Sequence, residues 1–169
     1  RLAGWSVASA HPNLSFADPV RAAAAFPGTY CGVEGDAAAC EAIEALLGEI
    51  GGKPFRINGK DKALYHAAAV FSNNFATVLQ GLAREAWAEA GVPEEIAEKL
   101  NAGLLEAAFR NTVALGPQEA LTGPAARGDR DVVTAQGARV RGWSPEAGDV
   151  YDALSEMAAR LKETGRASG

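Results

Sequence analysis

The pattern of apolar positions predicts strands and helices in the first part of the chain. Short apolar runs over residues 5–10, 29–33 and 53–58, separated by Pro and Gly breaks, are typical of strands. An Ala-rich helical turn is expected over 18–26, and 37–50 carries apolar residues at helical spacing. Because a strand, a helix and a strand joined by brief loops form a βαβ unit, we expect parallel strands with a right-handed crossover.

The longest predicted helix runs from about Asp61 to Ala90, and residues 63–83 within it contain no Asp, Glu, Lys or Arg. At about 100° per residue, one of its faces is apolar and the opposite face is polar. A helix face in water normally carries Lys and Glu. The pattern therefore predicts a helix enclosed nearly all round, with a polar stripe facing a cleft or a partner. The apolar face consists of Leu64, Ala67, Phe71, Phe75, Val78 and Leu82, and the polar stripe of Lys62, His66, Asn73 and Gln80.

Only helices are predicted after this point, over about 93–116, 132–140 and 148–162. The change of class near residue 60 divides the chain into two expected domains. Residues 1–60 form an α/β part, and residues 61–169 form an all-α part.

Composition and charge exclude several classes of function. A net charge of −5 without a basic run argues against a nucleic-acid binder, and 48% hydrophobic residues can bury a sizeable core. Cys31 and Cys40 have no metal-ligand spacing, so we expect buried free thiols in a cytoplasmic protein. Two histidines exclude a His-rich metal site, and no metal is expected. The sequence contains no GxGxxG, Walker or GxSxG motif.

Two segments require comparison with leader and membrane sequences. The apolar run of residues 1–10 is too short and too broken for a signal peptide. Residues 63–83 have transmembrane length, but side chains such as His66 and Asn73 are costly in lipid. We therefore expect a soluble protein without a membrane span. Because the chain begins without Met, directly at a predicted strand, we also expect it to be a fragment of a longer protein.

The first candidate site is the polar stripe of the long helix. Lys62 and His66 lie one turn apart, so both can reach one ligand and could polarise a carbonyl and relay a proton. Asn73 lies about 16 Å from Lys62 along the axis, so the three would line an extended cleft rather than one reacting group. The same residues also fit structural roles at a helix start, beside a carbonyl and in an interface.

Two loops give the other candidates. His11 and Ser15 in HPNLSF follow a strand end, where ligands bind in open parallel sheets, although a solvent-exposed turn fits as well. Thr122 and Arg127 lie in LTGPAARGD, which combines a fixed turn, backbone amides and a cation. That combination suits an anion, while Arg127 and Asp129 could equally cap neighbouring helices.

Four blocks in this order, HPNLSF, GVEGD, KALYHAAAVFSNN and GPQEALTGPAARGD, resemble bacterial Rossmann-like proteins that carry the C-terminal domain DUF2520. The architecture of that family is similar to pyrroline-5-carboxylate reductase and 6-phosphogluconate dehydrogenase. The HPxxSF block also resembles the His-Pro loop of prephenate dehydrogenases. The resemblance covers most of the chain and weakens after about residue 140.

The resemblance implies a fold, a cofactor and a partner. Residues 1–60 would be the second half of a Rossmann-like parallel sheet, and 61–169 a helical domain of the 6-phosphogluconate dehydrogenase C-terminal type that forms a homodimer. Relatives place a Lys and an Asn near the interdomain cleft, which would assign roles to Lys62 and Asn73, with His66 as an addition. NADP is the implied cofactor, although the first half of the nucleotide domain with its glycine loop is expected to be missing.

Two functions follow from these expectations. The first is the C-terminal portion of an NAD(P)-dependent oxidoreductase acting on a small carbonyl or imine. In it Lys62 and His66 orient and protonate the substrate and Asn73 positions ligand or cofactor. The second is a non-catalytic dimerisation or ligand-sensing module with a dehydrogenase-like fold. In the first reading, the cleft is closed by His11 and Ser15, and an anionic group is bound by Thr122 and Arg127.

Overall fold

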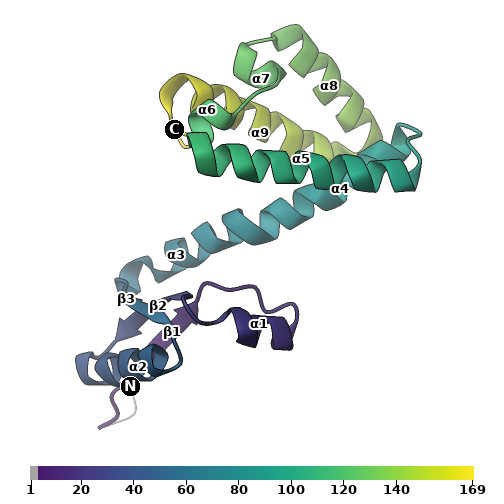
Figure 1. Ribbon diagram of the computed structural model, residues 1–169. Helices are drawn as coiled ribbons and strands as arrows, with labels where there is room; N and C mark the ends of the chain where they lie inside the picture. Colours follow the sequence, from purple (N-terminus) through teal and green to yellow (C-terminus); the bar gives the residue numbers. More distant parts are fainter. Residues whose placement is uncertain (1–3) are drawn as a thin grey trace. The chain divides into compact units, whose positions relative to one another are not determined.

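The computed structural model describes residues 4–169. Arg1 to Ala3, which open the segment compared with leader sequences, lie outside the described part. The chain divides into two compact units, Arg1–Ala76 and Thr77–Gly169. The first holds the sheet and the second only helices (Figure 1). The predicted fold class, a small Rossmann-like sheet followed by a helical region, is confirmed.

The sheet has three strands, β1 (Ala8–Pro12), β2 (Tyr30–Gly35) and β3 (Lys53–Arg56), in the order β1-β2-β3. Strands β2 and β3 are parallel and joined through helix α2 (Ala37–Glu49), which confirms the βαβ unit. Strand β1 is antiparallel to β2, with His11 opposite Gly32.

The direction of β1 corrects the expectation of an all-parallel sheet. A parallel neighbour requires a crossover that returns the chain along the whole strand. Helix α1 (Pro19–Ala25), which lies between β1 and β2, has seven residues. It is about 10 Å long, against about 17 Å for a strand of five residues. The chain therefore enters β2 from the end at which it left β1.

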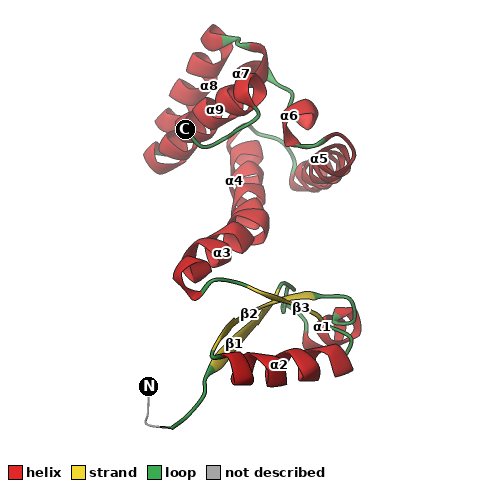
Figure 2. Ribbon diagram, turned by 90° about the vertical axis from the view of Figure 1, so that its left-hand side faces the viewer, coloured by secondary structure: helices red, strands yellow, loops and turns green. Residues whose placement is uncertain are grey.

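Helix α2 covers one face of the sheet (Figure 2). Alternate residues of a strand point to opposite faces, so Cys31 and Val33 of β2 face α2, where they meet Cys40 and Leu47 in the apolar core. Both cysteines are free and fully buried, as predicted. Burial raises the pKa of the Cys31 thiol, because the thiolate is costly in apolar surroundings.

Helix α3 (Lys62–Ala69) follows the short 3₁₀ turn η1 (Gly59–Asp61) and contacts part of the other face through its side chains. Its residues Lys62, Tyr65, His66 and Ala69, spaced by three and four, are half-buried, and they form the face toward the strands. Tyr65 lies so close to β2 that a Cβ at Gly32 would be 2.7 Å from its hydroxyl oxygen. Gly32 is therefore the position that admits the tyrosine ring.

The helical run continues through the π-helix η2 (Val70–Phe75) into α4 (Ala76–Glu89). The predicted long helix is confirmed, but its near-complete enclosure is wrong for the single chain. Leu64 is 73% exposed, Phe71 66% and Val78 57%. The physical reason is that the polar and aromatic face packs on the sheet, which leaves the apolar stripe without cover from its own unit.

The helical unit contains α5 (Glu94–Leu115), α6 (Pro117–Ala120), α7 (Pro124–Arg127), α8 (Arg130–Trp143) and α9 (Pro145–Thr164). Helices α4 and α5 are joined by Asn101, which accepts from Trp87 Nε1 at 3.0 Å and donates to the carbonyl oxygen of Gln80 at 3.1 Å. Helices α8 and α9 pack at Gly148, where a Cβ would lie 2.7 Å from that of Arg141. In the described part of the chain, no helix is both long and apolar enough to cross a membrane.

Candidate functional site

A pocket of about 730 Å³ lies between the loop after β1 and the side of α3 and η2. The end of β1 and the loop after it contribute His11 to Ser15. The helical run contributes Tyr65 and His66 at one end and Ser72 to Asn74 at the other. Polar groups of several kinds therefore meet here on a scaffold of one strand and one helix. The pocket brings together His11, Ser15, His66 and Asn73, four of the residues that the sequence suggests.

The two histidines form the centre of this pocket. The rings of His11 and His66 lie 4.0 Å apart between centroids at an interplanar angle of 49°. The pKa of His11 lies below its ordinary value because of burial, with further contributions from His66 and Lys62. The lowered pKa favours the neutral form of His11, and a neutral imidazole has one donor and one acceptor nitrogen.

Lys62 lies beside the pocket without lining it. Its ammonium nitrogen donates to Ser9 Oγ at 2.7 Å and to Glu34 Oε1 at 2.8 Å. The side chain is thus held across β1 and β2, and its charge lowers the pKa of His11. Lys62 is near His66 on the helix, as the sequence predicts, but its hydrogen bonds go to the sheet.

Asn73 and Ser15 also line the pocket. Asn73 is about 10 Å from His66 along the helix axis at 1.5 Å per residue. It lies in η2, and single π turns occur frequently at functional sites. The role of Asn73 in an extended cleft remains a prediction.

The strand-end argument for His11 does not hold. Because β1 is antiparallel to β2, His11 and Pro12 lie opposite Gly32 and Cys31, near the start of β2. They are therefore at the amino end of the parallel pair, not its carboxyl end. His11 lines the pocket because its side chain is on the face of the sheet that α3 contacts.

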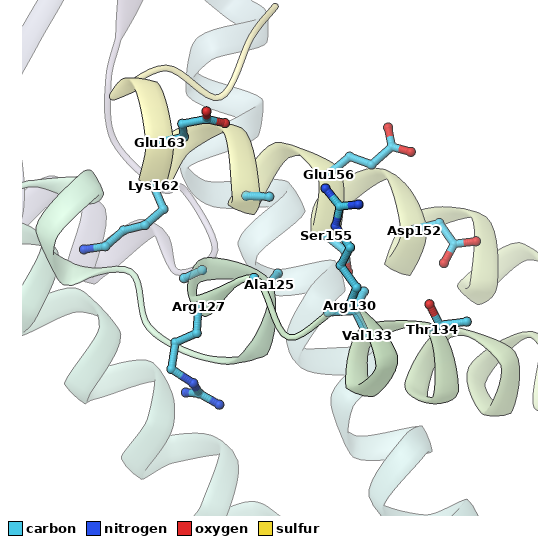
Figure 3. Close-up of a pocket in the computed structure, with 13 residues that line it drawn as sticks. Ala125, Arg127, Arg130, Val133, Thr134, Asp152, Ser155, Glu156, Lys162 and Glu163 are labelled. Atoms are coloured by element: carbon cyan, nitrogen blue, oxygen red, sulfur yellow. The ribbon is translucent and has the colours of Figure 1, made fainter.

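Thr122 and Arg127 belong to the helical unit, apart from this pocket. Arg127 lines a second pocket of about 570 Å³ between α7, α8 and α9 (Figure 3). Its guanidinium contacts Asp129 Oδ2 at 3.0 Å, so an anion would have to compete with that carboxylate. Thr122 precedes Gly123, whose positive φ of 98° turns the chain into α7. The anion-binding role of Thr122 and Arg127 remains a prediction.

Three residues that were not identified from the sequence contact predicted site residues: Asn13, Glu34 and Tyr65. Tyr65 Oη accepts from Asn13 Nδ2 at 2.5 Å and lies 3.5 Å from His11 Nδ1. Glu34 pairs with Lys62. The sequence contained one indication of this polar face, the alternation of Ser9 and His11 along β1. Their helical partners are distant in sequence, so the contacts could not be read from spacing.

Asn73 and Ser15 are the pocket residues that could hold part of a nicotinamide cofactor. The amide and hydroxyl groups of Asn73 and Ser15 suit a carboxamide or a ribose. A pyrophosphate normally binds a glycine-rich turn at a helix N-terminus, and this sequence has no GxGxxG motif. Across residues 4–169, no group of three or more His, Cys, Asp or Glu is arranged to hold a metal ion.

Known structures are similar to this chain in fold. A protein from Thermotoga maritima is 29% identical with a TM-score of 0.77, over 94% of this chain and 62% of its own. A protein from Bacteroides fragilis, named as a putative NADP oxidoreductase, is 23% identical with a TM-score of 0.65, over 80% of this chain and 51% of its own. A pyrroline-5-carboxylate reductase from Coxiella burnetii is 15% identical with a TM-score of 0.47, over 91% of this chain and 57% of its own. This chain therefore spans about 62% of the length of the Thermotoga protein.

Sequence comparison with curated proteins gives no match. The family model described as "Domain of unknown function (DUF2520)" matches residues 29–158, which run from the start of β2 to the middle of α9. The matched segment includes Lys62, Tyr65, His66 and Asn73, while the His11 loop precedes it. The chain belongs to the DUF2520 family.

Proposed function

We propose that this chain is the substrate-binding portion of an NAD(P)-dependent oxidoreductase that reduces a small carbonyl or imine. The observation that supports this most directly is the His11 ring 4.0 Å from His66, in a pocket also lined by Ser15 and Asn73. Such a pocket can hold a polar acceptor and move a proton to it. The name of the Bacteroides relative supports the same reaction class.

Each residue has a defined role in this proposal. The substrate oxygen or nitrogen binds beside the His11 and His66 rings, and His66 delivers the proton that converts it to the alcohol or amine. Asn73 and Ser15 orient the ligand along the pocket. Lys62 keeps positive charge beside the histidines through its contacts with the sheet. When bound, the reduced nicotinamide supplies the hydride that completes the reduction.

The long helical run contributes a partner surface, and the helical unit contributes an anion site, in this proposal. We place the homodimer contact on the exposed apolar stripe, and a bound anionic group at Thr122 and Arg127 of the partner copy. The reduced cysteines fit a cytoplasmic protein. The support for the dimer is the exposure of Leu64, Phe71 and Val78, which a single unit leaves uncovered.

A second candidate function is a non-catalytic dimerisation or ligand-sensing module. The observation that favours it is the ion pair of Lys62 with Glu34, which gives this lysine a structural task. In this case the pocket would bind a ligand without turning it over. Turnover, rather than binding alone, separates the two functions.

The test is a calorimetric titration of the full-length protein with NADPH, followed by turnover of a panel of small ketones, aldehydes and cyclic imines. We expect His66→Asn to lower kcat at least about a hundredfold, the scale of a lost acid–base group. Glu106→Gln on the exposed side of α5 is the control and should leave kcat unchanged. NADPH binding without turnover of any panel member would support the sensing module instead. Unchanged turnover in Lys62→Met would remove Lys62 from the reaction.

A further inference from the structure

A chain of hydrogen bonds runs from a backbone carbonyl to the ring of His11. The carbonyl oxygen of Tyr30 accepts from the backbone N–H of Asn13 at 2.9 Å and from its side-chain nitrogen at 3.3 Å. The same side-chain nitrogen contacts Tyr65 Oη at 2.5 Å. Tyr65 Oη in turn lies 3.5 Å from His11 Nδ1. All of these groups belong to the first unit.

The direction of the first bond is fixed. A backbone carbonyl oxygen only accepts hydrogen bonds. The atom of Asn13 that contacts Tyr30 must therefore be the amide nitrogen, and the alternative placement of the amide, with its oxygen in that position, would set two acceptors together. The amide nitrogen has two protons. One is directed to Tyr30 and the other to Tyr65.

The direction of the remaining bonds follows from the first. Because Tyr65 Oη accepts from Asn13, its own proton is left to be donated. The acceptor within reach is His11 Nδ1. An imidazole that accepts at Nδ1 in its neutral form carries its proton at Nε2. We infer that Tyr65 is a positioning residue that fixes His11 as the Nε2–H tautomer, so that the pocket offers a hydrogen-bond donor to an acceptor atom of the substrate.

The surroundings of Tyr65 hold the ring where this relay requires it. Its edge contacts with His11 and Phe55 have centroid distances of 5.5 and 6.0 Å. On the sheet side, its hydroxyl lies over Gly32, where a Cβ would be 2.7 Å away. The tyrosine is therefore set by packing on three sides, while Asn13 and His11 occupy its hydroxyl.

The tautomer has a consequence for the kind of ligand. A neutral imidazole with Nε2–H donates to a carbonyl oxygen or an imine nitrogen and offers nothing to a hydroxyl proton or an ammonium group. The pocket should thus favour the unreduced form of the substrate over the product amine or its ammonium. This inference about ligand class rests on the proposed function, whereas the tautomer itself does not.

The direct test is nitrogen-15 NMR of histidine-labelled full-length protein at about pH 8.5, roughly two units above an ordinary histidine pKa. The spectrum distinguishes the two neutral tautomers, and the His11→Asn and His66→Asn variants assign the signals. We expect the Nε2–H form for His11 in the parent protein. The Nδ1–H form there would overturn the proposal, whether or not the protein is an enzyme.

Two variants test the origin of the tautomer. Tyr65→Phe keeps the ring and removes the hydroxyl, so the His11 signal should shift to a mixture of tautomers. Asn13→Asp replaces the donor by an acceptor, so Tyr65 should donate to it and His11 should change to Nδ1–H. Tyr30→Phe is the matched control, since Tyr30 lies on the same face and takes part through its carbonyl oxygen. If the nitrogen-15 signals of His11 are unchanged in both Tyr65→Phe and Asn13→Asp, the role of Tyr65 is overturned.

Turnover gives an independent reading if an activity is found. Tyr65→Phe should lower kcat/KM about tenfold, the scale of one hydrogen bond to a neutral group, and Tyr30→Phe should not. The correct tautomer without any turnover would refute the proposed reaction and leave the positioning role intact. Full turnover in Tyr65→Phe with a changed tautomer would show that the donor at Nε2 is not used.

Discussion

The two faces of the small sheet carry opposite chemistry although they share one strand. On the α2 face, Cys31 and Val33 are fully buried among apolar side chains. On the α3 face, the intervening Gly32 and Glu34 meet Tyr65 and Lys62. The α2 face is closed, whereas the α3 face leaves Tyr30 60% and Phe55 37% exposed. Because side chains alternate along β2, one set of its residues packs in the apolar core and the other set contacts the polar groups of α3.

The largest expected effect comes from a substitution on the α2 face. Val33→Ala should lower the free energy of unfolding by about 2–3 kcal/mol, because it removes buried methyl groups and leaves a cavity. Its neighbour in the chain, Glu34→Ala, should cost under about 1 kcal/mol, since that side chain is partly exposed. Urea unfolding of both variants gives the comparison. Equal losses would show that the two faces do not differ in their contribution to stability.

Gly32→Ala tests how tightly the α3 face is packed. The added methyl group would meet Tyr65 at 2.7 Å, so the ring must shift. We expect a loss of about 1–2 kcal/mol in unfolding free energy, the usual cost of overpacking. Gly48→Ala in α2, where the new Cβ has nothing within 4 Å, is the control and should be neutral or stabilising. A stable Gly32→Ala with an unchanged Tyr65 environment in NMR would contradict the close contact.

The ion pair on the α3 face should contribute less than either packing change. Lys62 and Glu34 are 36% and 23% exposed at their side chains, so water screens the interaction. A double-mutant cycle of Lys62→Met and Glu34→Gln should give a coupling energy of about 0.5–1 kcal/mol. The coupling should weaken in high salt. A coupling energy of zero would mean that the ion pair affects the electrostatics of the pocket without stabilising the fold.

The smallest expected effect is a dependence of stability on pH. The ordinary pKa of a histidine is 6.5, and the pKa of His11 in the folded protein is lower. Between the two values the unfolded chain binds more protons than the folded one, so stability falls as pH falls from 6.5 through the folded pKa. Above 6.5 the contribution is fully present. His11→Asn should flatten this part of the curve of unfolding free energy against pH, and a slope that persists in the variant would assign it to another group.

The sequence predicted the local elements of this fold well and its long-range contacts poorly. The run from β2 through α2 to β3 was predicted because apolar period and turn residues define it directly. The direction of β1 was not, because an alternating strand pattern is the same whichever way the strand runs. The polar stripe with Lys62 and His66 was predicted, and the structure shows what it faces.

The candidate site shows the same limit. His11 and His66 were identified separately, on a loop and on a helix, and nothing in their spacing predicts rings 4.0 Å apart. Tyr65 was overlooked because an aromatic residue next to a polar stripe looks like a packing residue until its hydroxyl partners are known. The expected enclosure of the helix failed because amphipathicity shows that two faces differ, not which of them is covered within one chain.

The π turn η2 can be understood as a helix that has absorbed one extra residue. Its wider turn, Val70–Phe75, carries the amide end of the pocket. Deletion of a single residue there would restore ordinary helical geometry and change the directions of Asn73 and Asn74, while α4 would keep its register. The directions of the amide side chains that line the pocket thus depend on one residue in this turn. Length variation at this position would change which ligands the pocket accepts while leaving the sheet and its core untouched.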